Sequence, residues 1–274
     1  MLAPARCGGP TPQPLTTSGF FLSAETRPVF RRSHALPSAI VRRRTCLMAP
    51  LAAGLAACAT APEVAPTPQG WTEFRLPGKR PTRYMAVRDG ELDLIRAEAE
   101  ASASMLRRPV HIEPEALGQL TFSWRVPRLI EGADLTDRDA SDSPARIVLA
   151  FGGDPTRLPE RTRAMFELAQ VLTGEAPPYA TLMYVWDNRL PPETVLHSPR
   201  TDRIRKIVVD SGTSGLGAWR QHRRELAADF HRAFGEAPGP LVGLALMTDA
   251  DNTRSRASAW YGTVQVTTVD GRVL

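Results

Sequence analysis

The sequence predicts a mainly β protein, in which residues 71–274 form one β-sandwich or jelly-roll-like domain that carries two amphipathic helices. The first observation is a series of short segments in which apolar and polar residues alternate, the period of a half-buried strand. The second is a pair of such runs, 84–88 and 91–95, joined by Asp89-Gly90, which is typical of hairpin turns. The third is the Gly, Pro and Asp residues that separate the segments, as in sandwiches and jelly rolls.

Six further segments favour strands because they are short, apolar or alternating, and bounded by turn residues. They are residues 120–126, 145–151, 181–186, 204–210, 241–248 and 257–267. Residues 161–173 and 219–234 instead repeat their apolar side chains at helical spacing. We expect these two helices to cover an open end of the sandwich.

The residues before the domain have the features of an export signal. Arg42-Arg43-Arg44 precedes an apolar run, 46–57, which ends in Leu55-Ala56-Ala57-Cys58. A basic stretch, a short apolar run and small residues at the end are typical of a secretory signal, and the run is too short to span a bilayer. We therefore predict a signal peptide over residues 41–57 and a Pro- and Ala-rich tether over residues 58–70.

Leu55-Ala56-Ala57-Cys58 also resembles the lipobox of bacterial lipoproteins. The resemblance implies cleavage before Cys58 and acylation of that cysteine, which anchors the protein to a membrane. Ala59, in place of Asp, implies an outer-membrane lipoprotein of the cell envelope that faces the periplasm. The alternative is an ordinary buried apolar helix.

Residues 1–40 fit this leader poorly, because a signal peptide begins close to its basic stretch. They are rich in Pro, Ser, Thr and Arg without strand or helix periodicity. We interpret them as disordered or as the product of a start site assigned too early, with translation beginning near Val41.

Charge and cysteine content narrow the classes of function. The chain has a net charge of +5, but seven basic residues and one acid precede Cys58, which leaves 27 basic and 28 acidic residues. The basic excess belongs to the leader, so the sequence does not favour a nucleic-acid partner. Cys7, Cys46 and Cys58 are the three cysteines. The domain therefore contains no disulfide, no cysteine-bound zinc and no cysteine nucleophile.

Three tryptophans in expected strands, Trp124, Trp186 and Trp260, are candidate ligand-binding residues, because aromatic faces stack on sugar rings. Trp124 is followed by Arg125 and Trp186 by Asp187, so each of these two has a polar neighbour near a strand end, and Asp187 is a candidate ligand-binding residue as well. The alternative is that these tryptophans fill the core of the sandwich. Asp142 and Arg146 are further candidates, either as a structural ion pair or as a grip for an anionic ligand.

Asp249, Asp251 and Asn252 lie together before the last expected strand and offer oxygen donors that suit a hard cation such as Ca²⁺. The spacing is not that of an EF-hand, since Arg254 and Trp260 stand at the sixth and twelfth positions. The alternative is a turn that ends one strand and begins the next.

Several blocks of the domain resemble one bacterial envelope family, known as domain of unknown function 3047. They include residues 120–154, LMYVWDN at 182–188, IRKIVVDSG at 204–212 and the segment 246–266. The resemblance implies the fold and an envelope location, and it implies no activity. The blocks are also similar in outline to jelly-roll modules that bind carbohydrate, which is an analogy of fold alone.

Catalytic motifs are missing: the chain has no His-Glu-x-x-His, no phosphate-binding loop and no nucleophile elbow. The sequence therefore favours a non-catalytic, lipid-anchored protein that binds a ligand such as a glycan. One alternative is a hydrolase acting on an envelope polymer with two carboxylates. The other is a scaffold or assembly lipoprotein that binds an envelope protein.

Overall fold

The computed structural model describes residues 70–198 and 201–274, which contain two β-sheets and two α-helices. One sheet consists of β1 (Thr72–Arg75), β4 (Ala103–Ile112), β6 (Ser143–Phe151), β7 (Ala180–Asp187), β8 (Val195–His197), β9 (Ile204–Ser211) and β11 (Leu241–Asp249). The other consists of β2 (Arg83–Asp89), β3 (Leu92–Glu100), β5 (Gln119–Arg125), β10 (Arg220–Glu225) and β12 (Arg256–Thr267). The helices are α1 (Glu160–Thr173) and α2 (Leu226–Phe234), with short 3₁₀ turns at Pro114–Ala116 and Pro155–Arg157.

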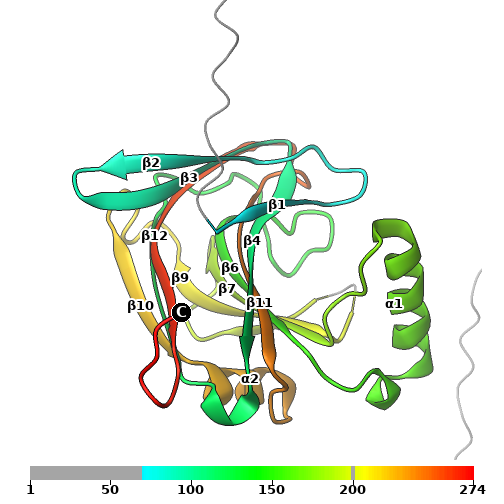
Figure 1. The fold of residues 1–274 in the computed structure, drawn as a ribbon. Coiled ribbons are helices and arrows are strands. Elements are labelled where there is room, and N and C mark those ends of the chain that lie inside the picture. Colours follow the sequence, from blue (N-terminus) through cyan, green and yellow to red (C-terminus); the bar gives the residue numbers. More distant parts are fainter. Residues whose placement is uncertain (1–69, 199–200) are drawn as a thin grey trace, which may run out of the picture. The chain divides into compact units, whose positions relative to one another are not determined.

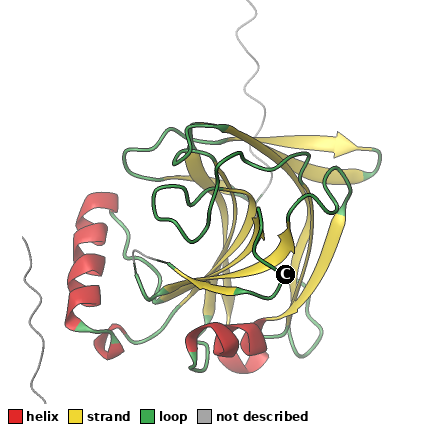
Figure 2. Ribbon diagram, turned by 180° about the vertical axis from the view of Figure 1, so that it is seen from behind, coloured by secondary structure: helices red, strands yellow, loops and turns green. Residues whose placement is uncertain are grey.

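The strand order is β1-β4-β11-β6-β7-β9-β8 in the seven-stranded sheet and β10-β5-β12-β3-β2 in the five-stranded sheet. Every neighbouring pair is antiparallel except β7 and β9. The two sheets face each other, and the helices lie outside them, as Figures 1 and 2 show. The predicted mainly β, jelly-roll-like sandwich with two helices is therefore confirmed.

The core lies between the sheets and is built by the alternating residues of the central strands. Phe122 and Trp124 of β5 face Tyr184 and Trp186 of β7, and all four side chains are fully buried. Their rings contact one another directly, with centroids 5.0 Å apart for Phe122–Trp124 and 6.4 Å for Trp124–Trp186. Aromatic side chains bury large areas in such pairs, so this cluster is a major source of the sandwich's stability.

The seven-stranded sheet is apolar on its outer face as well. Ala103, Val148, Ala245 and Met247 form a buried cluster there, against which Met183 packs. Strands that are apolar on both faces read as continuous apolar runs, such as the Ile-Val-Leu-Ala-Phe of β6. The outer face therefore needs a cover of its own.

Helix α1 provides only part of that cover. Figure 1 shows it standing to one side of the sheets, and Thr162 is its only buried residue. Leu168, Val171 and Leu172 are 60%, 81% and 69% exposed. The helix ends at Gly174, whose φ of 79° is the left-handed conformation that glycine adopts readily. Among the described residues, neither α1 nor α2 has the length and apolar character that crossing a bilayer requires.

The strand and helix predictions hold in most places, and the hairpin of β2 and β3 forms with Asp89 opposite Leu92. The predicted helix over 219–234 is wrong in its first half, because residues 220–225 form the edge strand β10 and only 226–234 are helical. The prediction omitted β4, which contains two arginines and Pro109. Pro109 lies where the register with β11 shifts, a position that tolerates a residue without an N–H.

Candidate functional site

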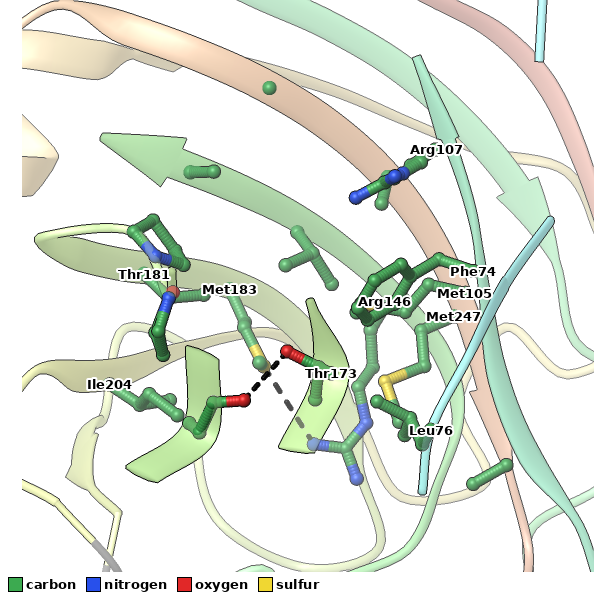
Figure 3. A pocket seen from close by; sticks show the side chains of 18 of the residues that line it. Phe74, Leu76, Met105, Arg107, Arg146, Thr173, Thr181, Met183, Ile204 and Met247 are labelled. Carbon is green, nitrogen blue, oxygen red and sulfur yellow. Dashed lines mark hydrogen bonds between the residues drawn. The ribbon is translucent and has the colours of Figure 1, made fainter. Parts of the chain in front are cut away.

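A groove opens over the outer face of the seven-stranded sheet, with a cavity volume of about 930 Å³. Its floor is formed by side chains of β4, β6, β7, β9 and β11, and its walls by β1 on one side and α1 with the segment after it on the other. Figure 3 shows Phe74, Leu76, Met105 and Met247 on one side of the groove, with Thr181 and Ile204 on the other. Ligand pockets commonly have volumes of about 300–1,000 Å³, so this groove can hold a small molecule.

Methionine is concentrated in this groove. The described residues contain five methionines, and four of them, Met105, Met165, Met183 and Met247, line it. Three come from adjacent parts of the floor and Met165 comes from α1. Methionine is unbranched and polarizable, and it is used at surfaces that adapt to more than one apolar ligand shape. The groove is therefore suited to a flexible apolar group.

A buried ion pair stands at one end of the floor. Arg146 and Asp249 are 3% and 4% exposed, and Nε and Nη2 of the arginine donate to the two carboxylate oxygens at 2.9 Å each. Nη2 also donates to the carbonyl oxygen of Ser141 at 2.8 Å. The remaining nitrogen, Nη1, reaches only the sulfur of Met183, at 4.0 Å, and this contact is drawn as a dashed line in Figure 3. The predicted partner of Arg146 was Asp142, and that pairing is wrong.

Lys206 of β9 lies beside this ion pair. It is 4% exposed and its Nζ donates to Oγ of Ser141 at 2.8 Å. Ser141 thus contacts both cations, one through its carbonyl and one through its hydroxyl. Two buried cationic groups, Arg146 and Lys206, thus lie beside the apolar side chains of the floor, with Asp249 and Asp251 close by.

Three carboxylates meet beyond the ion pair. Asp142, Asp249 and Asp251 each place an oxygen within 4.8 Å of the others, an arrangement that could hold a metal ion. Burial raises the pKa of Asp249 to about 6, opposed by the Arg146 charge and reinforced by that of Asp142. Oxygen ligands of this kind suit Ca²⁺, as the sequence led us to expect for Asp249 and Asp251.

Each of these carboxylates already has a partner, however. Asp142 accepts from the backbone N–H and the hydroxyl of Thr253 at 2.7 and 2.6 Å. Asp251 forms an ion pair with Lys79, and Asp249 is held by Arg146. A metal ion would have to displace at least one of these contacts.

The acidic segment itself is a turn between β11 and β12. It is fastened by Asp142 and by Asn252, whose side-chain amide donates to the carbonyl of Arg138 at 3.2 Å. The predicted turn is confirmed, although Asp142 caps it from a distant part of the chain. Asp251 and Asn252 line the end of the groove at the same time.

Trp124 and Trp186 do not reach the groove. Both are completely buried between the sheets, where Nε1 of Trp124 donates to Asp210 at 2.7 Å and Nε1 of Trp186 to the carbonyl of Gly212 at 3.1 Å. A ring without exposed surface has no face for a ligand, so their predicted role in ligand stacking is wrong and they are core residues. Asp187 is also buried and accepts from the backbone N–H groups of Arg189 and Leu190, which makes it a turn residue.

Trp260 is the one predicted tryptophan with exposed surface, and it lies on the five-stranded sheet, away from the groove. The guanidinium groups of Arg125 and Arg96, from the neighbouring strands β5 and β3, lie over its ring at 4.6 and 5.2 Å. Arg125 also lies over Trp219 at 5.3 Å. These contacts form a row of alternating Arg and Trp side chains on that sheet.

Sequence reasoning missed most of the groove. The methionines of its floor, Met105, Met183 and Met247, and Lys206 occupy alternate positions of β4, β7, β11 and β9 that point away from the core. The available signal was the apolar character of both faces of β6 and β11, which indicates that a strand is covered twice. No periodicity shows whether the second cover is protein or ligand.

A family model described as "Protein of unknown function (DUF3047)" matches residues 69–265 of the chain. A comparison with curated proteins finds no match. Among solved structures, the chain is similar to the xyloglucanase domain of NopAA, a type three effector from Sinorhizobium fredii in complex with cellobiose, with 8% identity, a TM-score of 0.39 and coverage of 73% of this chain and 94% of that one. It is also similar to the family 11 xylanase from Neocallimastix patriciarum, with 10% identity, a TM-score of 0.36 and coverage of 73% and 92%. At TM-scores below 0.5, these likenesses carry no argument about function.

Proposed function

We propose that this chain, which belongs to the family of proteins of unknown function DUF3047, is a non-catalytic binding protein of the bacterial envelope whose ligand occupies the groove. The observation that carries the proposal is the 930 Å³ cavity with its methionine-rich floor. A closed surface would bury these apolar side chains against protein, whereas here Met105 and Met183 are only half-buried and Met165 is 44% exposed at the edge of the cavity. A ligand with an apolar body would bury them.

The lining of the groove favours such a ligand over a plain sugar chain. Among the described residues that line it, none is a tryptophan or a tyrosine, and the aromatic ones, Phe74 and Phe166, lie on the walls. Sugar sites use aromatic faces together with many polar groups. The expected glycan is therefore a better candidate for another surface of the protein.

The carboxylates of the groove support binding over hydrolysis. Glu175, Asp249 and Asp251 are the acidic side chains that line it among the described residues. They are held by Arg107, Arg146 and Lys79 respectively. A carboxyl group that is locked to a cation is a poor proton donor for a leaving group.

The envelope location remains part of the proposal. Cys58 and the other residues that predict a signal peptide and a lipid anchor lie outside the described residues. An acylated Cys58 would hold the domain near the outer membrane on the tether 58–70. Ligands with apolar parts are abundant at such a surface. Mass spectrometry of the mature protein would detect the acylated cysteine.

Native mass spectrometry can test the binding function. Both sheets and the core lie within residues 70–274, so this part can be exported to a bacterial periplasm and purified without detergent. A single cooperative thermal transition verifies that it is folded. We expect a bound small molecule at close to one per chain.

Two tryptophan substitutions provide the contrast. Ala150 is half-buried on the groove floor, and Ala164 is exposed on α1 outside the lining. Ala150→Trp fills the cavity and should abolish the bound mass, whereas Ala164→Trp should retain it. No bound molecule in the wild type, or equal retention in both variants, would contradict the proposal.

A glycan is the second candidate ligand, and the row of Arg and Trp side chains around Trp260 favours it. This row crosses adjacent strands on the outer face of the five-stranded sheet, where an extended polymer could lie. Calorimetric titration with polysaccharide fragments should detect binding that Trp260→Ala removes and Ala150→Trp leaves unchanged. Absence of heat with every fragment would discard this candidate.

A further inference from the structure

We infer that the groove binds an anionic amphiphile with a single acyl chain, whose headgroup contacts Arg146 and Lys206 and whose chain lies on the methionine floor. The inference rests on the proposed binding function and names the ligand class for that same groove. It combines two independent observations. The first is that Nη1 of the buried Arg146 has only a thioether as its partner, and the second is the apolar, methionine-rich floor beside it.

The buried cation is Arg146. Two of its three guanidinium nitrogens are bound at 2.8–2.9 Å to Asp249 and Ser141, while Nη1 has only the thioether of Met183 at 4.0 Å. A thioether is a weak acceptor, and a buried donor without a good acceptor costs free energy. A carboxylate or phosphate oxygen in the groove would supply that acceptor, and arginine binds such oxygens in planar, directed geometry.

Lys206 makes this end suitable for an anion. Its Nζ and the Arg146 guanidinium both donate to Ser141, so the two cationic groups lie on either side of one residue. The nearby carboxylates of Asp249 and Asp251 are bound to Arg146 and Lys79. Each of these pairs is compensated locally, and the headgroup of a bound anion would lie next to the guanidinium of Arg146 and the ammonium of Lys206.

The rest of the floor has the chemistry of a chain-binding surface. Met105, Met183 and Met247 alternate with the small side chains of Ala103 and Ala245, which leave depth between the sulfur-bearing arms. Flexible methionines adapt to a chain that has many conformers. Arg107, two residues after Met105 on β4, is the charged side chain next to this part of the floor, and Glu175 forms an ion pair with it.

The length of the floor also agrees with an acyl chain. The groove crosses the sheet from β9 to β1, which are five strand spacings apart. At about 4.8 Å per spacing, this is roughly 24 Å. Arg146 lies on β6, which is three spacings or roughly 14 Å from β1. One leaflet of a bilayer core measures about 15 Å, half of the total, so a chain of about that length fits between the headgroup and the wall at β1.

A fluorescent fatty acid tests the inference directly. Residues 70–274 are titrated with cis-parinaric acid and, separately, with its uncharged methyl ester, which carries the same chain. We expect the acid to bind at least tenfold more tightly than the ester. Both probes should lose affinity together in Ala150→Trp, because the chain site is blocked.

Charge variants locate the headgroup. Lys206→Met and the double variant Arg146→Leu/Asp249→Asn should each reduce the preference for the acid to threefold or less, while the ester binds as before. Arg161→Met removes an exposed cation outside the groove lining and is the matched control. Thermal unfolding identifies any variant that fails to fold, and the two variants act independently of each other.

Displacement of the probe separates the possible sources of the headgroup. Oleate carries a carboxylate and lysophosphatidylglycerol a phosphate, and displacement by either one upholds the inference. Displacement by methyl oleate alone, equal binding of acid and ester by the wild type, or an unchanged preference in both charge variants would overturn it. Failure of acid and ester alike to bind would instead refute the proposed function of the groove.

Discussion

Removing Arg146 should destabilise the protein in a pH-dependent way, because Asp249 would then be a buried carboxyl without a cation. Losing one partner of a buried ion pair typically costs about 3–5 kcal/mol. We expect a loss of unfolding free energy of this size for Arg146→Leu at pH 7. Asp249 is the main partner, since it accepts two of the three hydrogen bonds that the Arg146 guanidinium donates to oxygen.

The pH dependence follows from the pKa of Asp249, which is about 6 in the folded protein against an ordinary 3.8. A raised carboxyl pKa means that stability falls as the pH rises above 3.8, until the folded-state pKa is reached. At about 1.36 kcal/mol per pH unit, this group alone stabilises the wild type by roughly 2 kcal/mol on going from pH 7 to 4.5. In Arg146→Leu the folded-state pKa of Asp249 should exceed 7, because its cation is gone. The same shift from pH 7 to pH 4.5 should then stabilise the variant by roughly 3.4 kcal/mol.

The difference between wild type and variant should therefore be about 1.4 kcal/mol smaller at pH 4.5 than at pH 7. Urea denaturation at both pH values measures it, and contributions of other groups cancel in the difference. The double variant Arg146→Leu/Asp249→Asn keeps an acceptor for the N–H of Ser143, which now donates to Asp249 at 3.1 Å. It should show no such change with pH. An equal loss for Arg146→Leu at both pH values would refute this reasoning.

Three further variants test other parts of the structure. Arg224 and Arg232 lower the pKa of Glu193 to about 2, so the stabilising effect of this carboxylate is present above pH 4.5 and is lost as the pH falls to 2. Because its side chain is 49% exposed, we expect Glu193→Gln to cost only about 1 kcal/mol at pH 6 and under half of that at pH 3 in urea denaturation. Equal costs at the two pH values would contradict this account. Lys79 forms an ion pair with Asp251, one of the three clustered carboxylates, and so competes with a metal ion for that carboxylate. Lys79→Met should therefore enlarge any rise in Tm that Ca²⁺ causes and EDTA reverses. A smaller rise than in the wild type would argue against a cation site. A Cβ at position 239 would lie 2.1 Å from the carbonyl oxygen of Gly152. Gly239→Ala should therefore cost about 1–3 kcal/mol of unfolding free energy in thermal or urea unfolding. Gly243→Ala is the control, because its added Cβ meets an ordinary contact at 3.4 Å, and a smaller cost for Gly239→Ala than for this control would refute the clash.

Predictions based on short-range patterns succeeded where local preference and burial agree. The hairpin of β2 and β3 is one example, because its turn and both alternating runs are encoded within a few residues. They failed for β10, where Arg220–Glu225 is polar and has helical periodicity with the residues after it. Hydrogen bonds from β5 make it an edge strand instead. Such bonds join residues about a hundred positions apart, which no local window detects.

The site shows the same division. The sequence identified Arg146, Asp142 and the segment 249–252 as chemically notable, and these do meet at one end of the groove. It could not assign their partners, because Asp142 is the acid next to Arg146 in the chain, whereas the actual partner, Asp249, stands 103 positions away. It also placed Trp124 and Trp186 in strands correctly without showing which face they occupy, and both face the core.

The sequence alone determines the class of fold and the sets of residues that share a face, because strand alternation and turn chemistry are local properties. Our prediction of an export leader and of an acylated Cys58 also rests on the sequence alone, because these residues lie outside the part that the structure describes. The tertiary structure alone decides that the second apolar face of β4, β6 and β11 opens into a groove. That outcome depends on where α1 stands and on how the sheets pair, and both are settled by contacts between residues far apart in the chain.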